Sequence, residues 1–159
     1  MCLQEFLGYQ FLYYVFCELE TETLRMLKTL TPEEKKQETV AHALKTRNAL
    51  VQCNYGRFFK LYQSAPGKAA ALIDVFIDKI RIQCLQKLAV GFIATNIQLD
   101  YLSNLLAFDS PTELEAFLVE RQCIFVEASE VTAGSQRLNC KESLKALKSA
   151  PLRVRRCKK

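Results

Sequence analysis

The sequence has few residues that break helices and few that build metal sites. Its 159 residues include five glycines, four prolines and one histidine. So few glycines and prolines leave little room for long linkers. The seven cysteines are scattered and form no Cys-x-x-Cys pair, which argues against a cysteine–histidine zinc site. An odd and scattered set of cysteines is typical of a reducing compartment.

The sequence also lacks an apolar run that could span a bilayer. The most apolar window, residues 3–17, is shorter than the roughly 20 residues of a membrane helix and contains Glu5. With no visible signal peptide, we expect no membrane partner. A helix over residues 3–19 would be apolar on nearly every side. We therefore expect that further helices normally cover one of its faces; the alternative is that later helices of this chain cover it.

Acidic residues are missing from the end of the chain. Residues 1–144 contain all 17 acids and 15 of the 22 lysines and arginines, whereas the last fifteen residues contain the other seven cations. The basic character of the protein therefore belongs to its tail. The short basic run is typical of a nuclear localisation signal or a nucleic-acid contact.

Residues 39–66 form the pattern around which we organise the chain. The pattern predicts a helix whose apolar face contains Val40, Ala43, Leu44, Leu50 and Val51. Asn54 and Gly56 favour a tight turn. A second helix follows, and we assign a structural role to its aromatic residues Tyr55, Phe58, Phe59 and Tyr62. A short connection makes two such helices antiparallel, which is the unit of a helical array. The alternative is an isolated helical hairpin, which the periodicity alone does not exclude.

The flanking segments predict further helices. Residues 20–30 read as a short helix, Thr31 and Glu34 as a capping box, and residues 68–90 as the longest helix. The pattern then shortens. It predicts strands within residues 93–99, 124–126 and 137–139, and helices over residues 100–108, from Ser110 to about Gln122, and from Asn139 through Leu147.

Helix, helix, strand, turn, strand is the order of a winged-helix module. The predicted fold is mainly α, a right-handed array of helical hairpins followed by a small winged-helix module. We place the helical-repeat part at residues 1–92, the winged-helix part at 93–148 and a basic tail, expected to be disordered, at 149–159.

Several runs resemble a known family. They are residues 5–14, 40–44, 54–62 and 65–66, and the match continues through residues 101–102 and 106–108 to 116–118. The run from Asn54 to Tyr62 is the most distinctive. Over residues 4–147 the chain resembles the PCI-domain proteins of the SAC3/GANP family, in the branch of leukocyte receptor cluster member eight and yeast Thp-three. Family members have further helices and basic segments upstream, and the tail after Ala150 does not match them.

The resemblance implies a non-enzymatic nuclear scaffold in messenger RNA processing or export. It implies a second PCI subunit as partner, with winged helix beside winged helix, and a small acidic Sem/DSS-type subunit joined through that partner. It also implies binding of RNA across the joined surface. The alternative is a PCI subunit of the proteasome lid, the COP9 signalosome or a translation initiation factor complex.

The residues themselves suggest interfaces and no catalytic centre. We expect no cofactor, metal or small-molecule substrate, because no nucleophile–base set or phosphate loop is visible. His42 reads as a packed helical histidine, although a ligand or base role stays open. The helix after Ser110 exposes Glu113, Glu115 and Glu120, which would repel phosphate, so protein pairing is the better use of this module. The candidate edge strand for that pairing is Ile124, Phe125 and Val126.

Candidate RNA contacts are the cations that lie away from these acids, with a solvated face as the alternative. They would add affinity for RNA that does not depend on its sequence and decreases as the salt concentration rises. They are Arg57 and Lys60 in the second helix of the hairpin, Arg137, Lys141, Lys145 and Lys148 after the wing, and Arg153, Arg155, Arg156, Lys158 and Lys159 in the tail.

Overall fold

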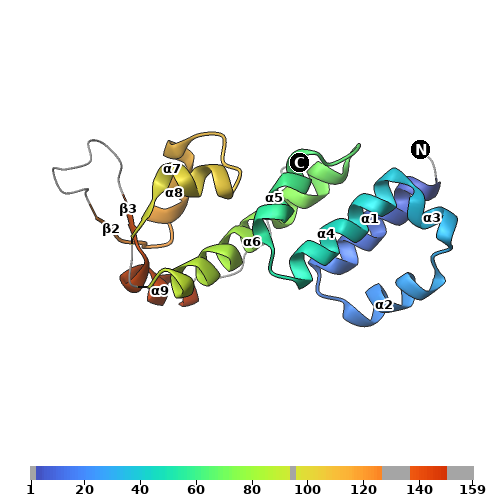
Figure 1. Cartoon of the computed structure of the whole chain (residues 1–159), viewed down its shortest axis with the longest axis horizontal. Coiled ribbons are helices and arrows are strands. Elements are labelled where there is room, and N and C mark those ends of the chain that lie inside the picture. The colour runs from blue at the N-terminus through green and yellow to red at the C-terminus, as the bar shows by residue number, and fades with distance from the viewer. Residues whose placement is uncertain (1–2, 94–95, 127–136, 150–159) are drawn as a thin grey trace. The chain divides into compact units, whose positions relative to one another are not determined.

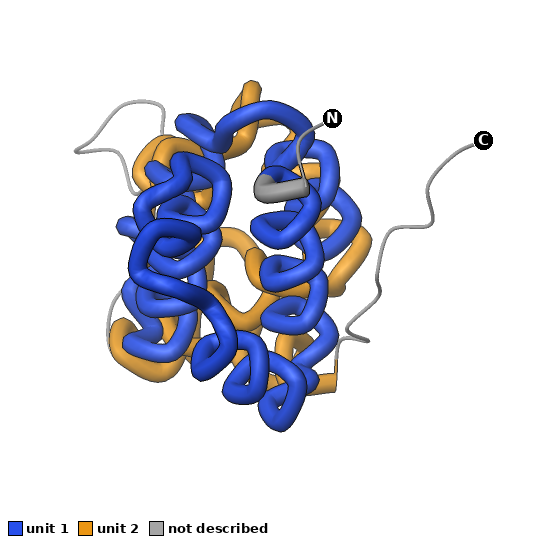
Figure 2. The backbone as a smooth tube through the Cα atoms, turned by 90° about the vertical axis from the view of Figure 1, so that its right-hand side faces the viewer, with its two compact units in different colours: residues 1–77, 154–159 blue, residues 78–153 orange. Residues whose placement is uncertain are grey.

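A computed structural model describes residues 3–93, 96–126 and 137–149, without the side chains of Leu3, Gln4 and Val126. The described chain is mainly helical, as predicted (Figure 1). It divides into two compact units between Ile77 and Asp78 (Figure 2). Helix α6 (Ala69–Gly91) belongs to both units, because it runs from one into the other.

Unit 1 is helical throughout its described part. It contains α1 (Leu3–Phe16), α2 (Glu20–Thr29), α3 (Pro32–Lys36), α4 (Glu38–Val51), α5 (Tyr55–Gln63) and the beginning of α6. Figure 1 shows α1 and α4 side by side. Their backbones approach closely at Gly8, where a Cβ atom would lie 2.9 Å from the carbonyl carbon of Thr39. A side chain at this position would therefore force the two helices apart.

Aromatic rings fill the core of unit 1. The Phe16 ring stacks on Phe76 with centroids 5.3 Å apart and meets Phe58 edge-on at 6.4 Å. Phe58 also packs edge-on against Phe59 at 5.2 Å. These are the favoured geometries of aromatic pairs. The rings of α1, α5 and α6 thus hold the three helices together.

Helix α1 is covered on one side within this chain. Phe11, Leu12 and Phe16 are buried, whereas Phe6 and Tyr13 are 53% and 48% exposed. Part of its apolar surface therefore faces solvent in unit 1.

The capping box predicted at the third helix is present. The Thr31 hydroxyl accepts from the Glu34 N–H, and the Glu34 carboxylate accepts from the Thr31 N–H at 2.8 Å. The Thr31 N–H and the Thr31 hydroxyl both donate to the Glu34 carboxylate and lower its pKa, since they favour its charged form.

The turn between α4 and α5 differs in detail from the prediction. Asn54 caps α5 by accepting from the Arg57 N–H at 3.0 Å, but Gly56 lies inside α5. The residue with the left-handed backbone is Cys53, at φ 53°. Val51 is 68% exposed, so its predicted place on the apolar face of α4 is wrong, and Thr46 and Ala49 are buried on that helix instead.

Unit 2 combines the end of α6 with helices and a small sheet. It contains β1 (Asn96–Gln98), α7 (Leu99–Leu105), α8 (Pro111–Val119), β2 (Phe125–Val126), β3 (Arg137–Asn139) and α9 (Cys140–Ser149). The strand order is β1–β3–β2, with both pairs antiparallel. Each predicted strand region contains one of these strands. Helix α8 ends at Val119, before the predicted end at Gln122, which has φ 55° and turns the chain.

Helix α6 is buried more widely than one stripe would require. The predicted stripe residues Ile73, Ile77 and Cys84 are buried, as expected. Ile82 and Leu85, on other sides of the helix, are buried as well. Within unit 2, the Gln86 side chain donates to the Leu147 carbonyl at 2.8 Å and fastens α9 to α6.

Candidate partner and nucleic-acid interfaces

Helix α8 presents acids and buries most of its large apolar residues, although Val119 is 62% exposed. Ser110 caps the helix by accepting from the Glu113 N–H at 3.3 Å, and Pro111 occupies the first turn. Leu114, Phe117 and Leu118 are buried, which leaves the carboxylates on the outer side: Glu113 and Glu120 are exposed and Glu115 is half-buried. A negative face of this kind repels the phosphates of a nucleic acid.

Strand β2 lies at one edge of the three-stranded sheet. Phe125 pairs with Leu138 and Val126 with Arg137, and β3 uses its other side for β1. The preceding residue, Ile124, has a side chain that is 45% exposed. An edge strand offers backbone groups to which a further strand can pair.

The entry into β2 is anchored by a serine that sequence reasoning missed. The fully buried Ser143 of α9 accepts from the Ile124 N–H at 2.9 Å, and its hydroxyl lies 3.3 Å from the Ile124 carbonyl oxygen. The Asn139 N–H donates to that carbonyl at 2.9 Å. The backbone of Ile124 is thus held from inside while its side chain faces outward. The signal that could have found Ser143 is its spacing, three residues after Cys140 and four before Leu147, which places it on the apolar face of α9.

Helix α9 has a cationic outer side. Asn139 caps it by accepting from the Glu142 N–H at 3.2 Å. Cys140, Ser143 and Leu147 are buried, and Lys141, Lys145 and Lys148 are exposed at helical spacing. Arg137 on β3 is half-buried, and its Nε atom is buried without a hydrogen-bond partner.

The remaining predicted cations lie apart from α9. Arg57 and Lys60 are exposed on α5, one turn apart, and belong to unit 1. Arg153, Arg155, Arg156, Lys158 and Lys159 lie outside the described residues. The α9 lysines and the α5 cations are therefore two separate sets on two units.

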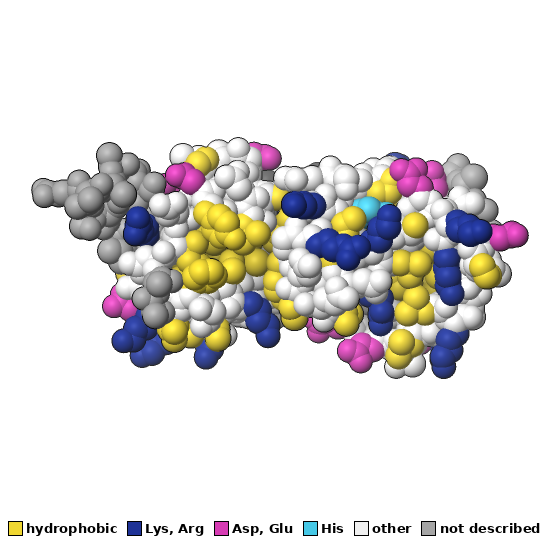
Figure 3. Space-filling model, viewed as in Figure 1, with side chains coloured by type: hydrophobic (Ala, Val, Ile, Leu, Met, Phe, Trp, Pro, Cys, Tyr) yellow, Lys and Arg dark blue, Asp and Glu magenta, His cyan; other side chains and the backbone are white. Residues whose placement is uncertain are grey.

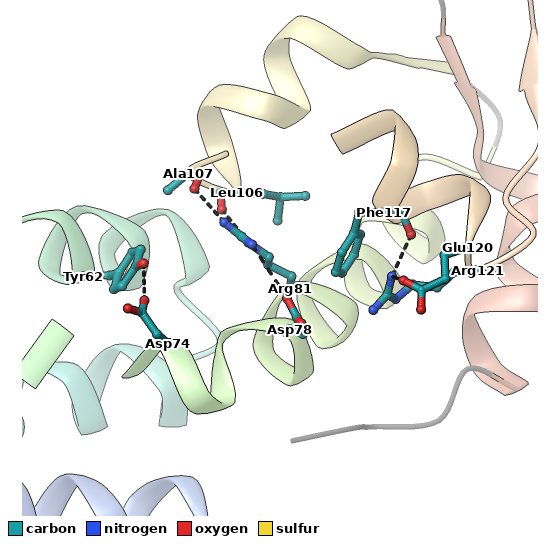
Figure 4. A network of polar contacts seen from close by, with 9 residues as sticks. All are labelled: Tyr62, Asp74, Asp78, Arg81, Leu106, Ala107, Phe117, Glu120 and Arg121. Atoms are coloured by element: carbon teal, nitrogen blue, oxygen red, sulfur yellow. Dashed lines mark hydrogen bonds and ion pairs between the residues drawn. The ribbon is translucent and has the colours of Figure 1, made fainter. Parts of the chain in front are cut away.

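Two further arginines are used internally, as Figure 4 shows. Arg81 of α6 is 5% exposed; its Nε and Nη2 atoms donate to the carbonyls of Leu106 and Ala107 at 3.2 and 2.7 Å. Its Nη1 atom lies 3.7 Å from an Asp78 oxygen, and its guanidinium carbon lies 3.7 Å from the Phe108 ring centroid. The signal that could have revealed Arg81 is its position between Ile80 and Ile82 in an apolar helix.

Arg121 makes the second such contact. It packs over the Phe117 ring at 3.4 Å, donates to the Phe117 carbonyl at 2.7 Å and pairs with Glu120 at 3.0 Å (Figure 4). The guanidinium groups of Arg81 and Arg121 thus hold protein atoms, and the candidate phosphate contacts are the exposed cations described above.

The structural aromatic residues of α5 divide into two pairs. Phe58 and Phe59 are buried, and Tyr55 and Tyr62 are half-buried. The Tyr62 hydroxyl donates to the Asp74 carboxylate of α6 within unit 1 (Figure 4). This bond fastens α5 to α6 in addition to the ring contacts.

His42 lies in the packing between α4 and α5. It is 7% exposed, and its Nε2 atom donates to the Leu61 carbonyl, 2.9 Å away, because a carbonyl oxygen only accepts. Its Nδ1 atom is buried without a partner. The position agrees with the packed-histidine interpretation.

The buried thiols are poorly suited to nucleophilic chemistry. Burial raises the pKa of Cys84 to about 12 and that of Cys123 to about 11. The described residues contain no cluster of three or more histidine, cysteine or acidic side chains fit to hold a metal ion. None of the described helices is both long and apolar enough to cross a membrane.

Comparisons with known proteins agree on one family. Residues 3–127 match the SAC3/GANP family. A THP3 homologue of Schizosaccharomyces pombe is 32% identical over 140 residues, which are 88% of this chain and 34% of that protein. The leukocyte receptor cluster member 8 homologue of Xenopus laevis is 34% identical over 145 residues, 90% of this chain and 17% of that protein.

A plant relative covers less of the chain. The SAC3 family protein A of Arabidopsis thaliana is 34% identical over 112 residues, 67% of this chain and 11% of that protein. The chain therefore spans about a third or less of the length of these relatives.

Proposed function

The chain belongs to the SAC3/GANP family, and we propose that it is a non-enzymatic scaffold subunit of a nuclear complex for messenger RNA processing or export. In this proposal it pairs with a second PCI subunit, and a small acidic Sem/DSS-type subunit joins through that partner. Family membership over residues 3–127 is the observation that carries the proposal.

The order of elements in unit 2 supports a winged-helix module. Helices α7 and α8 precede the antiparallel strands β2 and β3, and β1 completes the sheet on the other side of β3. We propose that this module forms the winged-helix part over residues 93–148 and that the helices up to residue 92 form the helical-repeat part.

The charge of α8 supports protein pairing through this module. Glu113 and Glu120 are exposed where a major-groove helix would need hydrogen-bond donors. The β2 edge, with the exposed side chain of Ile124, supplies apolar surface for a partner. We propose Ile124, Phe125 and Val126 as partner contacts.

RNA would be bound without sequence preference by cations away from α8. The exposed α9 lysines and the exposed α5 cations are suited to phosphate contacts, together with the tail outside the described residues. The basic tail also supports a nuclear location.

Capture of partners from nuclear extract tests this proposal. The tagged 159-residue chain is expected to enrich a second PCI subunit together with a small acidic subunit, identified by mass spectrometry. Ile124→Asp is expected to lower this enrichment at least about tenfold, because it places a charge at an apolar contact edge. Val51→Asp, an exposed position on unit 1, is the matched control and should leave the enrichment unchanged.

Two outcomes would contradict parts of the proposal. Enrichment of proteasome lid, COP9 signalosome or initiation factor subunits in place of the expected partner would reject the assigned complex. Equal capture by wild type and Ile124→Asp would reject β2 as the contact edge.

A further inference from the structure

A second feature of unit 1 extends the proposed function and rests on it. Between Glu38 and Asp74 the sequence contains no acidic residue, while it contains five cations: Lys45, Arg47, Arg57, Lys60 and Lys68. The structure describes all of these residues and places them on α4, on α5 and, for Lys68, in the turn just before α6, in one compact unit. The hairpin α4–α5 thus has no acidic residue after Glu38, which opens α4.

The cations of this hairpin lie on neighbouring elements. The bond from His42 to the Leu61 carbonyl fixes the level at which α4 and α5 meet. Lys45 lies three residues beyond His42, and Lys60 is next to Leu61, so both lie within about one helical turn, 5.4 Å, of that contact. Arg57 lies one turn further along α5. Figure 3 shows lysine and arginine side chains gathered over α4 and α5 on the face that it presents.

These side chains are available to a ligand. Lys45, Arg57, Lys60 and Lys68 are exposed, and Arg47 is half-buried. The Lys68 N–H donates to the Tyr9 hydroxyl at 3.0 Å, which holds the backbone of this residue against α1 while its side chain faces solvent. The acids that border this segment are Glu38, at the start of α4, and Asp74, which already accepts the Tyr62 hydroxyl. Four exposed cations therefore lie on elements that are packed and hydrogen-bonded to one another.

The composition of the surface favours a nucleic acid over a protein. Protein interfaces are depleted in lysine and contain buried apolar anchors. Over residues 39–73, all described, Val51 is the one large hydrophobic side chain that is exposed, at the far end of α4. Long lysine chains on separate elements suit the regularly spaced charges of a phosphate backbone.

We propose that the acid-free hairpin surface of Lys45, Arg57, Lys60 and Lys68 binds the phosphate backbone of single-stranded RNA. It acts independently of the basic tail and of the α9 lysines. The surface has no sequence preference, because its contacts are made to phosphates.

Binding of a fluorescent single-stranded RNA to the full chain, titrated at several salt concentrations, tests this inference. The variant K45Q/R57Q/K60Q/K68Q is expected to bind at least about tenfold more weakly at 0.1 M salt. Its salt slope should be smaller by about 3, since each lost contact to single-stranded RNA removes about 0.7. The chain lacking residues 151–159 should keep the binding that the hairpin supplies and lose it when the four substitutions are added.

The matched control carries the same loss of charge elsewhere on unit 1. R25Q/K28Q/K35Q/K36Q removes four exposed cations from α2 and α3, where Glu20, Glu22, Glu33 and Glu34 lie nearby. This control is expected to change RNA affinity less than about threefold, because those cations are already offset by acids. Circular dichroism melts of both variants show whether folding is retained.

The outcomes separate this inference from the proposed function. If the wild-type chain does not bind RNA, alone or with its captured partner, the RNA part of the proposed function fails. If RNA binding depends on the tail or on α9 and the hairpin variant equals the control, the hairpin inference is overturned together with the proposed α5 contacts. The scaffold role and the other RNA contacts of the proposed function then stand. If the hairpin variant keeps RNA affinity but loses an acidic protein partner, the surface is a protein docking site and the inference is again overturned.

Discussion

At the scale of single residues, Gly8 allows the backbones of helices α1 and α4 to approach closely. A Cβ atom there would lie 2.9 Å from the Thr39 carbonyl carbon and 3.0 Å from the Thr39 Cβ atom. Both neighbours belong to the opposite helix and one is backbone, so the contact is not relieved by turning a side chain. In the sequence, Gly8 reads only as a weak point in an apolar helix.

Gly8→Ala is expected to destabilise unit 1 although alanine favours helices. Insertion of a methyl group against the backbone of α4 costs about 1–3 kcal/mol, more than the roughly 1 kcal/mol that alanine gains over glycine inside a helix. Urea unfolding followed by circular dichroism measures the difference. Gly91→Ala is the matched control, because a Cβ atom at Gly91 meets nothing within 4 Å. A Gly8→Ala protein as stable as the Gly91→Ala protein would contradict the close approach.

At the scale of elements, Arg81 fastens the end of α7 to α6 within unit 2. The carbonyls of Leu106 and Ala107 lie just after helix α7, which ends at Leu105, and have no further helical turn to bond. The Arg81 guanidinium fills that role and also stacks on Phe108. Phe108 in turn packs edge-on against Phe117 of α8, with centroids 5.3 Å apart. The placement of the acidic α8 surface thus depends on a buried cation.

Arg81→Met is expected to lower the free energy of unfolding by about 2–4 kcal/mol. The methionine fills the space but leaves two carbonyls unbonded and the mostly buried Asp78 without this arginine. Arg25→Met removes an exposed ion pair with Glu22 at 3.2 Å and should cost less than about 1 kcal/mol. Thermal and urea unfolding compare the two variants. A loss for Arg81→Met no greater than that for Arg25→Met would show that the buried contact does not hold unit 2 together.

At the scale of the whole molecule, the exposure of the cysteines differs between the two units. Cys17 is half-buried and Cys53 exposed in unit 1, whereas Cys84, Cys123 and Cys140 are buried in unit 2. Burial raises the pKa of all three thiols in unit 2, because the charged thiolate is poorly solvated there. Reactivity toward a thiol reagent therefore separates surface from core.

Native labelling at pH 8 is expected to modify Cys53 rapidly and Cys84 and Cys123 only as unit 2 unfolds. With a pKa of about 12, the thiolate fraction of Cys84 at pH 8 is about one in ten thousand. Peptide mass spectrometry over a urea series follows each site. Labelling of Cys84 as fast as that of Cys53 in native buffer would contradict its burial.

The raised pKa values of these thiols also determine how the free energy of unfolding changes at alkaline pH. Because the folded pKa values of Cys84 and Cys123 are raised above their unfolded values, their contribution is fully present below about pH 9. It is lost as pH rises through about 11 to 12. Cys84→Ala should flatten this alkaline loss.

Local patterns determined much of the helical organisation. The capping residues Thr31, Asn54 and Ser110 act through bonds to the next few residues, so the helix starts were predictable from sequence. The three strand regions and the acidic outer side of α8 followed from alternation and spacing in the same way. The interfaces proposed on unit 2 and the tail stay predictions, since they depend on molecules outside the chain.

Other features were decided by tertiary contacts. The Arg81 clamp and the Ser143 anchor join residues 25 and 19 positions apart. The Gly8 contact likewise joins residues distant in the sequence, so no local periodicity records it. Residue type alone favours Asn54 or Gly56 for the left-handed turn. The structure places it at Cys53 instead, because the packing of α4 against α5 fixes the length of the connection. Sequence specified which segments are helical; the long-range packing decided which polar side chains are enclosed and which cations remain exposed.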